Sequence, residues 1–600
     1  MFNSKRITTN CFISLTKTNR KGLPMNLNQL AKKLFPAFIE GTKNLKPCRL
    51  FLSASDMKTR AVVRHAVSDN PADAWTFALE ELKEAFGSKK PFILRADWVI
   101  ESQVMTWENC LKLIGTTRRN YFRFGIAFDS DYNVAITESE LNGYAILYKD
   151  GKDGSGRGIF RAERCNEYCQ TRFNRDMPKL EKSNPVEVFK TGGAFVSEED
   201  QKPLSLLTDG LETGHRYISH TDSDTILKMV RSGARFLAGE VQKSGKFIYG
   251  HWPCFDKNVP KYNTLRHFSS SFAMLDVYET YRMGEMKIGA AINKAIKYGV
   301  EHFIKYRTLP DGSEAAYIYE TEEKEIKLGA LGVILVMFIK HAKLMKTKKY
   351  YPLMNALARA IYTMQKPDGS FVHVLNSDDF SVKEEFRIVY YDGEAVFGMM
   401  KLYSLTHDET LLRASQLAFQ RFIATDHWKN HDHWLSYSIN ELTLYSPDRE
   451  YFEFGINNFL DFLPFIYHRD TQFPTLLELM MAADSMLERL KTMPEMADLL
   501  ARVPLDDFYA AMEARAKNLL NGYFYPELAM FFQKPESIVG SFFIRHQAFR
   551  VRIDDVEHFL SALTAYRRYL ARRDHNPQPS KELLEGKAEG SGLFNIQAGK

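Results

Sequence analysis

The stretch that decides the fold is ARAIYTMQKPDGSFVH at residues 358–373, followed by YYDGEA at residues 390–395. It begins as a helical pattern, passes through an Asp-Gly turn and continues into a short extended segment. Polar residues then open a second helical pattern that becomes apolar. Asp-Gly is typical of tight turns because glycine tolerates the backbone conformation that many turns require. The stretch therefore predicts two helices joined as a hairpin.

The same order of features recurs through the C-terminal two-thirds of the chain. A second clear turn is Leu309-Pro310-Asp311-Gly312-Ser313. Hydrophobic periodicity predicts six successive helix pairs. They are 226–241 with 262–281, 288–306 with 326–341, 351–365 with 393–404, 411–424 with 439–444, 451–465 with 474–487, and 504–520 with 554–570.

The two members of a pair differ in how their apolar residues are distributed. Residues 411–424 carry one stripe, made by Leu412, Ser415, Ala418, Phe419 and Phe422, whereas residues 328–339 are apolar nearly all round. One-sided helices pack on a surface and all-round apolar helices are buried. An outer ring around an inner ring satisfies both patterns, which predicts a mainly α (α/α)6 toroid of six helical hairpins. A superhelical solenoid is the alternative, but its repeats usually span ~34–47 residues, against a spacing here of about 60.

A chain of 600 residues is long enough for two or three domains. Before the toroid, strand and helix patterns alternate and predict a smaller α+β domain of unknown role. The predicted divisions are a basic N-terminal tail at 1–44, the α+β domain at 45–200, a linker at 201–223, the toroid at 224–573 and a disordered tail at 574–600.

Charge and composition limit the classes of partner. Residues 1–60 hold 12 Lys/Arg and 2 Asp/Glu, which leaves 68 and 72 for the rest of the chain. A nearly neutral body argues against nucleic acid as a partner. The basic N-terminus is a solvated tail, a weak contact with an anionic surface, or sequence upstream of a start at Met25. No apolar run reaches the ~18 residues of a membrane span.

Six cysteines do not form a disulfide scaffold, and no set of Cys and His has familiar zinc spacing. We therefore predict no metal and no cofactor, and residence in the cytoplasm.

In a closed ring, the turns and the starts of the inner helices face a common centre. Asp311 and Asp368 lie in Asp-Gly turns, where aspartate is favoured by turn geometry alone. Breaking a glycosidic bond usually needs two carboxylates. The predicted catalytic residues are Asp392, Glu394, Glu441 and Asp555. Capping of their helices is the alternative role for Asp392, Glu394 and Asp555.

Aromatic side chains offer apolar faces to sugar rings, and guanidinium groups bind carboxylates or phosphates bidentately. The predicted substrate-binding residues are Arg266, His267, His373, Tyr390, Tyr391, Trp434, Arg545, His546 and Arg552. Three arginines in this set predict an anionic saccharide as substrate.

The segments Tyr262–Ser270, Leu309–Ser313, Gln365–Phe371 and Tyr390–Tyr403 carry a resemblance. Over about residues 224–572 the chain resembles the six-hairpin glycosidase-like group, which includes glycoside hydrolases, uronyl C5-epimerases and polysaccharide lyases. The resemblance implies an enzyme that acts on a glycan, by hydrolysis first and by epimerisation or lysis next. Residues 45–200 resemble no family.

Two alternatives belong to other functional classes. One is a non-catalytic toroid that binds a glycan or a protein on one face. The other is a terpenoid-cyclase-like enzyme, because residues 365–371 are also similar to the QW repeats of triterpene cyclases. That chemistry uses an Asp-rich trigger, of which Ile553-Asp554-Asp555-Val556 is only a fragment.

Overall fold

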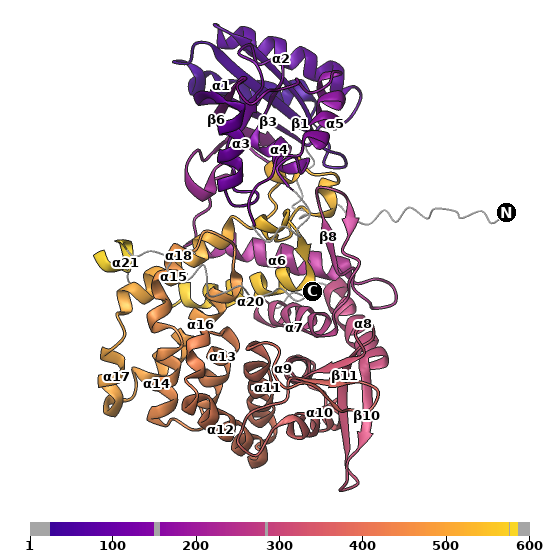
Figure 1. The fold of residues 1–600 in the computed structure, drawn as a ribbon, viewed down its shortest axis with the longest axis vertical. Helices are drawn as coiled ribbons and strands as arrows, with labels where there is room; N and C mark the ends of the chain where they lie inside the picture. Colours follow the sequence, from indigo (N-terminus) through magenta and orange to yellow (C-terminus); the bar gives the residue numbers. More distant parts are fainter. Residues whose placement is uncertain (1–24, 149–155, 282–285, 575, 586–600) are drawn as a thin grey trace, which may run out of the picture.

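A computed structural model describes residues 25–148, 156–281, 286–574 and 576–585. The chain forms an α+β part and a larger helical part, which lie one above the other in Figure 1. The predicted basic tail before residue 25 and the predicted tail after residue 585 lie outside the described residues.

The α+β part is built on one antiparallel sheet with strand order β2-β1-β3-β6-β4-β5, and β7 pairs with β6. Leu50 of β1 lies opposite Trp98 of β3, and Ile126 of β4 lies opposite Val188 of β6. The long strands β3 and β6 form the spine of the sheet. The strands are β1 (Cys48–Ser55), β2 (Val62–Ser68), β3 (Ile93–Thr106), β4 (Gly125–Ala127), β5 (Ala135–Ile136), β6 (Pro185–Ser197) and β7 (Leu204–Leu206).

Helices make two separate hydrophobic cores with this sheet. Leu34 and Phe38 of α1 (Leu27–Thr42) pack with Trp75 of α2 (Pro71–Phe86) and with Leu52 of β1. The second core joins α3 (Trp107–Thr116), α4 (Glu138–Gly143) and α5 (Ala162–Phe173) to the other end of the sheet. The predicted α+β class is confirmed.

The helical part is a closed double ring. Each inner helix packs on the next, and α20 returns to pack on α7. This closure confirms the predicted (α/α)6 toroid over the solenoid. The inner helices are α7 (Thr264–Tyr281), α9 (Leu328–Met345), α11 (Tyr390–Thr406), α13 (His433–Leu442), α16 (Pro474–Leu490) and α20 (Ile553–Leu570). The outer helices are α6 (Ser223–Glu240), α8 (Met286–Phe303), α10 (Tyr351–Met364), α12 (Glu409–Ala424), α14 (Arg449–Asn457) with α15 (Leu463–His468), and α18 (Leu505–Leu520).

Burial follows the two apolar patterns of the sequence. The outer helix α12 buries only a stripe that includes Ser415, Ala418, Phe419 and Phe422. The inner helix α9 is buried nearly all round. Among the described residues, α9 alone is long and apolar enough to cross a membrane, with a mean hydropathy of 1.7, and 78% of it is buried inside the ring. Its apolar character is therefore that of a core helix.

The inner helices α9 and α11 approach so closely that their backbones touch. A Cβ atom added at Gly332 would lie 1.9 Å from the carbonyl oxygen of Glu394. A Cβ atom at Gly398 would lie 2.6 Å from the Cα atom of Gly332. Glycine at both positions is therefore a packing requirement of the ring wall.

Two small sheets fill turns of the ring. One is β10 (Ile304–Thr308), β11 (Glu314–Glu320), β12 (Glu325–Lys327), β13 (Val374–Asn376) and β14 (Val382–Glu384), and the other is β8 (Gly250–Trp252), β9 (Lys257–Asn258) and β15 (Val551–Arg552). The aspartates of the Asp-Gly turns are exposed. Oδ1 of Asp311 accepts from the backbone N–H of Ser313 at 2.9 Å, and Oδ1 of Asp368 accepts from that of Ser370 at 3.1 Å. Turn geometry therefore accounts for both aspartates.

Several contacts join the two parts. Arg216 binds Glu527 bidentately, with both hydrogen bonds at 2.7 Å. The Ala61 N–H donates to the Met530 carbonyl at 2.7 Å, so the β1–β2 turn is held against the ring. The segment 201–223, predicted as a linker, contains β7 and a short 3-10 helix at Gly210–Glu212. The segment from 574, predicted as a tail, contains the short helix α21 (Lys581–Glu585), whose Leu583 is buried.

Candidate active site

Titratable side chains gather where the inner helices begin. Arg266 lies in the first turn of α7, Glu394 in the second turn of α11, and His433 at the start of α13. Glu478 lies in the second turn of α16 and His558 in that of α20. Five of the six inner helices therefore place a charged or ionisable side chain at the same end of the ring.

The sixth inner helix, α9, has a glycine near its start that leaves room for the Glu394 side chain. A Cβ atom at Gly329 would lie only 1.6 Å from Oε2 of Glu394. Glycine at this position lets the Glu394 carboxyl group lie against the backbone of α9. The first turn of α9 is therefore shaped around Glu394.

His558 is held by a carboxylate. Its Nδ1 lies 2.7 Å from Oε2 of Glu478, whose Oε1 accepts a hydrogen bond from Tyr437 at 3.1 Å. Oε2 of Glu557 lies 3.5 Å from the same Nδ1. Burial lowers the pKa of His558, but the two carboxylates outweigh it and raise this pKa to about 10. His558 is therefore an imidazolium at neutral pH.

The imidazole ring of His433 makes an edge-to-face contact with that of His558. The centroids of the two imidazole rings are 5.6 Å apart. Nδ1 of His433 lies 3.1 Å from Oδ1 of Asp432, the residue that caps α13 by accepting from the N–H groups of Trp434 and Leu435. Among the described residues, Nε2 of His433 has no hydrogen-bond partner. A carboxylate beside Nδ1 favours a proton there, which leaves the Nε2 lone pair available as a base.

Glu394 is a buried carboxyl group with 5% of its surface exposed. Burial raises its pKa well above the usual range, and the nearby Asp432 carboxylate adds to the effect. Its Oε2 has no partner within the part of the chain that the structure describes. The raised pKa favours the protonated form of Glu394, which can donate a hydrogen bond or a proton. Burial also raises the pKa of Glu557, to about 8.

Arginines neutralise the acidic pair at the start of α20. Arg266 lies 2.8 Å from Asp554, and Arg552 lies 2.9 Å from the same carboxylate and 3.1 Å from Asp555. Arg550 binds Asp555 through two hydrogen bonds of 3.1 Å. Burial opposes the charge on Asp555, but the two arginines outweigh it and hold its pKa below the usual range. Asp555 thus has the partners of a structural anion.

Aromatic residues predicted to bind substrate lie around the histidines. The ring of Tyr390 is 5.4 Å from that of His433, and the ring of Trp434 is 5.2 Å from it. His546, also predicted, is half-buried, and its Nδ1 has no partner among the residues that the structure describes. These three residues remain candidates for substrate contacts.

Asp392, His373 and Tyr391 form a group of their own behind the start of α11. Nε2 of His373 lies 3.2 Å from Asp392, and Nε2 of His427 lies 3.3 Å from it. Burial opposes the charge on Asp392, but these two histidines outweigh it and lower its pKa. The Tyr391 ring is 5.4 Å from that of His373. Asp392 thus supports the start of α11 from buried surroundings.

Three predicted site residues contact other parts of the structure than the starts of the inner helices. Glu441 lies at the C-terminal end of α13, where Lys401 is 3.2 Å from it. His267 is fully buried between Tyr262 and the Ala295 carbonyl of the outer helix α8. Arg545 reaches into the α+β part, where it lies 3.5 Å from Glu138. The structure therefore does not bring these three residues together with Glu394, His433 and His558.

Four central residues, His433, Glu478, Glu557 and His558, are not among the predicted catalytic or substrate-binding residues. The available signal for Glu478 is a lone acid inside the apolar run PTLLELMM of α16. A carboxylate that interrupts an all-round apolar helix must have a partner or a function, because an unpaired buried charge is costly. Glu557 comes two residues after the acidic pair Asp554-Asp555 on α20, and the sequence has no feature that distinguishes it from that pair.

The centre also offers ligands for a cation. One ligand atom from each of His433, Glu478 and His558 lies within 4.8 Å of the others. Glu478 and His558 are 2.7 Å apart at their closest atoms, which is a hydrogen-bond distance. Two ligands of one tetrahedral Zn²⁺ would be ~3.3 Å apart, given metal–ligand distances of ~2.0–2.1 Å. A metal ion bound by both Glu478 and His558 would therefore have to move their ligand atoms apart.

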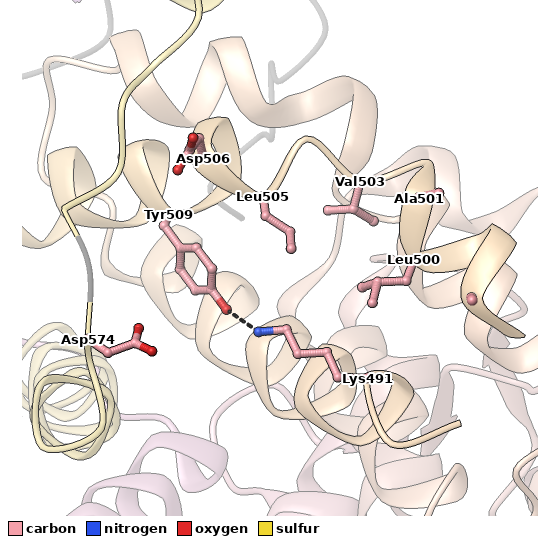
Figure 2. A pocket seen from close by; sticks show the side chains of 9 residues that line it. Lys491, Leu500, Ala501, Val503, Leu505, Asp506, Tyr509 and Asp574 are labelled. Carbon is pink, nitrogen blue, oxygen red and sulfur yellow. Dashed lines mark hydrogen bonds between the residues drawn. The ribbon is translucent and has the colours of Figure 1, made fainter. Parts of the chain in front are cut away.

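A large surface cavity lies elsewhere on the ring. It has a volume of about 740 Å³ and is lined by residues from the outer helices and their loops, including Lys491, Leu500 and Tyr509 (Figure 2). Lys491 donates to the Tyr509 hydroxyl at 3.2 Å, and the acids of the lining are Asp506 and Asp574.

Comparison with known proteins finds likeness in fold only. The sequence matches no protein-family model and no curated protein. A D-mannose isomerase matches in structure with 10% identity and a TM-score of 0.43, over 60% of this chain and 100% of that one. A cellobiose 2-epimerase from Bacillus thermoamylovorans matches with 10% identity and a TM-score of 0.43, over 58% and 100%. An α-1,6-mannanase from Salegentibacter sp. HEL1_6 matches with 10% identity and a TM-score of 0.39, over 58% and 100%.

Proposed function

We propose that the chain is a carbohydrate-active enzyme that moves a proton at a sugar carbon next to a carbonyl or carboxyl group, as an epimerase or isomerase does. The observation that carries this proposal is the edge-to-face pair of histidines, His433 and His558, whose rings are 5.6 Å apart. Each has a carboxylate beside its Nδ1, from Asp432 and Glu478. Proton transfer at carbon needs such a positioned base and acid.

The three groups, His433, His558 and Glu394, offer different atoms to a substrate and therefore have different roles. Nε2 of His433 takes the proton from carbon, because its lone pair is available. The imidazolium of His558 returns a proton to the substrate. The neutral carboxyl of Glu394 donates a hydrogen bond to the oxygen that gains negative charge, and buried donors of this kind stabilise such oxyanions strongly. Glu478 acts through His558, as a positioning residue.

Glycoside hydrolysis is the second candidate, because Glu394 has the raised pKa that a catalytic acid needs. Its partner would be Asp554, whose Oδ1 has no hydrogen-bond partner among the described residues. A non-catalytic toroid fits less well, because the ring centre holds converging titratable groups. Terpenoid cyclisation also fits less well, because Asp554 and Asp555 are occupied by arginines.

We infer an anionic substrate from a buried arginine that has no carboxylate partner among the described residues. Arg515 is 1% exposed, and its Nη2 donates to the Arg469 carbonyl at 2.8 Å. Its Nε and Nη1 have no partner in the described ranges, and burial lowers its pKa to about 9. A buried unpaired charge is costly, so an incoming anion would stabilise it. Burial, and after it the charges of Arg118 and Arg469, lower the pKa of His546 to about 3, so Arg469 lies between Arg515 and a residue predicted to bind substrate.

The cytoplasm remains our prediction for where the protein acts. Cys48, Cys110, Cys165, Cys169 and Cys254 are free and buried, as expected of a protein in a reducing compartment.

The decisive experiment is NMR in D2O with a panel of aldoses, ketoses, uronates and oligosaccharides. Proton transfer at carbon introduces deuterium next to the carbonyl, whereas hydrolysis releases a reducing end with no deuterium on carbon. We expect His433→Asn and His558→Gln to lower the exchange rate by ~10²–10⁴-fold. The exposed His302→Asn is the matched control and should keep full activity. Turnover without carbon-bound deuterium would favour hydrolysis and refute the proposed reaction.

A separate experiment tests the charge of the substrate. Arg515→Met should raise KM for a uronate or sugar phosphate and leave KM for the neutral analogue unchanged. Equal KM changes for both substrates would show that Arg515 acts on the fold alone.

A further inference from the structure

A second cavity lies at the joint between the α+β part and the ring. Its volume is about 460 Å³, and it shares no lining residue with the ring centre. Arg60, Tyr144 and Arg164 line it from the α+β part, and Phe255 and Lys257 line it from the ring. This volume lies within the ~300–1,000 Å³ range of small-molecule sites, which favour domain interfaces.

The lining carries an excess of positive charge. Its cations are Arg60, Arg164 and Lys257, and its one carboxylate is Glu167. Glu167 is exposed and lies 3.4 Å from Arg164, a long and weak contact. Among the described residues no ion pair joins Arg60 or Lys257 to an acid. The cavity therefore presents two or more uncompensated positive charges.

Aromatic rings hold the two guanidinium groups. The guanidinium of Arg60 lies 3.9 Å from the centroid of the Tyr144 ring, and that of Arg164 lies 4.7 Å from the Phe255 ring. Stacking against a ring fixes the plane of a guanidinium and leaves its in-plane N–H groups for an acceptor. The two stacks come from different parts of the chain and meet in one cavity.

Arg60 is the group that most needs an anion. Its Nη2 donates to the Cys254 carbonyl, while its Nε and Nη1 are buried with no hydrogen-bond partner in the described part of the chain. Burial lowers its pKa despite the opposing effects of Tyr144 and Cys254. A carboxylate or phosphate oxygen could accept from either of these N–H groups, and such charge-assisted hydrogen bonds are stronger than neutral ones.

We propose that this cavity is a binding site for a small molecule with a carboxylate or phosphate group, which Arg60 and Arg164 hold between the two parts of the protein. Lys257, on the exposed β9 strand, attracts the anion at the entrance. A ligand that contacts both parts stabilises their joint, because it binds only when the joint is formed.

The test is isothermal titration calorimetry of the full chain with inorganic phosphate, glucose 6-phosphate and glucuronate. We expect saturable binding of one or more of these probes below 1 mM, and Arg60→Gln and Arg164→Gln should weaken it by ~10-fold or more. Binding of the phosphates alone identifies a phosphate ester, and binding of all three identifies a general oxyanion site. If none of the probes saturates the protein at ~10 mM, the proposal is overturned.

Further variants separate binding at this cavity from folding and from the ring centre. Lys257→Glu changes an exposed residue and should weaken binding ~3-fold or more without unfolding the joint, since exposed charges contribute modestly. Lys112→Gln, an exposed cation of α3, is the matched control. In the Arg515→Met background, where the anion contact proposed for the substrate is removed, Arg60→Gln and Arg164→Gln should weaken the remaining binding by the same factor. If Arg515→Met abolishes binding and Arg60→Gln and Lys257→Glu do not, the anion binds at Arg515 and the proposal is wrong.

Discussion

The contact between α9 and α11 predicts that Gly332→Ala destabilises the ring. An added Cβ atom would lie 1.9 Å from the Glu394 carbonyl oxygen and 2.4 Å from its carbonyl carbon. Ordinary contact begins near 3.4 Å, so the two helices would have to move apart by about 1.5 Å. The obstacle is backbone, which cannot move aside by changing a rotamer.

Two opposing terms set the magnitude. Alanine in a helix interior is favoured over glycine by ~1 kcal/mol. Overpacking a core costs ~1–3 kcal/mol, and a backbone obstacle belongs at the upper end. The net expectation is a loss of about 2 kcal/mol. For a ring of ~350 residues the entropy of unfolding is ~0.7 kcal/mol/K, so Tm should fall by about 3 °C.

The matched control is Gly289→Ala in the outer helix α8. A Cβ atom there meets only the ring of Tyr278, at 4.0 Å. The helix-propensity gain is then unopposed, and Tm should rise by about 1 °C. Differential scanning calorimetry measures both variants. If Gly332→Ala is as stable as the wild type, or if both variants shift Tm in the same direction, the close approach of α9 and α11 is not as described.

The site and the domain joint give three further predictions. Glu394→Gln should lower turnover without abolishing it, because the amide still donates a hydrogen bond, and the variant should be more stable than the wild type at pH 7–8. A carboxyl group whose pKa is raised by folding stabilises the protein less as pH rises above ~4.3, so urea unfolding should show the difference vanish near pH 4. A gain that persists at pH 4 would contradict the raised pKa. The charged His558 stabilises the protein fully below pH ~6.5, and this contribution falls as pH rises toward its pKa of about 10. The free energy of unfolding of the wild type minus that of His558→Gln should therefore decline over that range in urea unfolding. A constant difference would refute the raised pKa. Glu527→Gln should lower the free energy of unfolding by ~3 kcal/mol, because it leaves the half-buried Arg216 without its bidentate partner. The exposed Glu80→Gln is the control and should leave the Tm unchanged. Equal stability of the two variants would show that the Arg216–Glu527 pair does not stabilise the contact between the two parts.

Much of the fold could be predicted because burial leaves a periodic trace in the sequence. The single stripe of residues 411–424 and the all-round apolar run of 328–339 separated outer from inner helices without any structural information. The fifth outer element was harder to define. It was expected as one helix over 451–465, but it is broken into α14 and α15, and Pro464 opens the second piece. Proline favours the first turn of a helix and interrupts a helix interior.

The candidate site was less predictable, for two physical reasons. The start of α13 was expected near residue 439, but Asp432 caps the helix earlier, and Glu441 therefore lies at its end. The direction of a side chain was the second difficulty. His267 is next to Arg266 in the sequence but points to the outer ring, and Arg545 contacts the α+β part. Such contacts depend on how distant segments pack, which no local pattern encodes.

The closure of the ring by α20 on α7 has a consequence for the order of events during synthesis. Arg266 emerges from the ribosome early, but its partner Asp554 and the imidazole of His558 arrive with the last hairpin. Domains form from the N-terminus as a chain is made, and hydrophobic surface that lacks its partner attracts other molecules. The side of α7 that packs on α20 therefore stays exposed until nearly the whole chain has been translated. A nascent chain that stops before α20 would have neither a closed wall nor a complete centre, so activity appears only with the final helix.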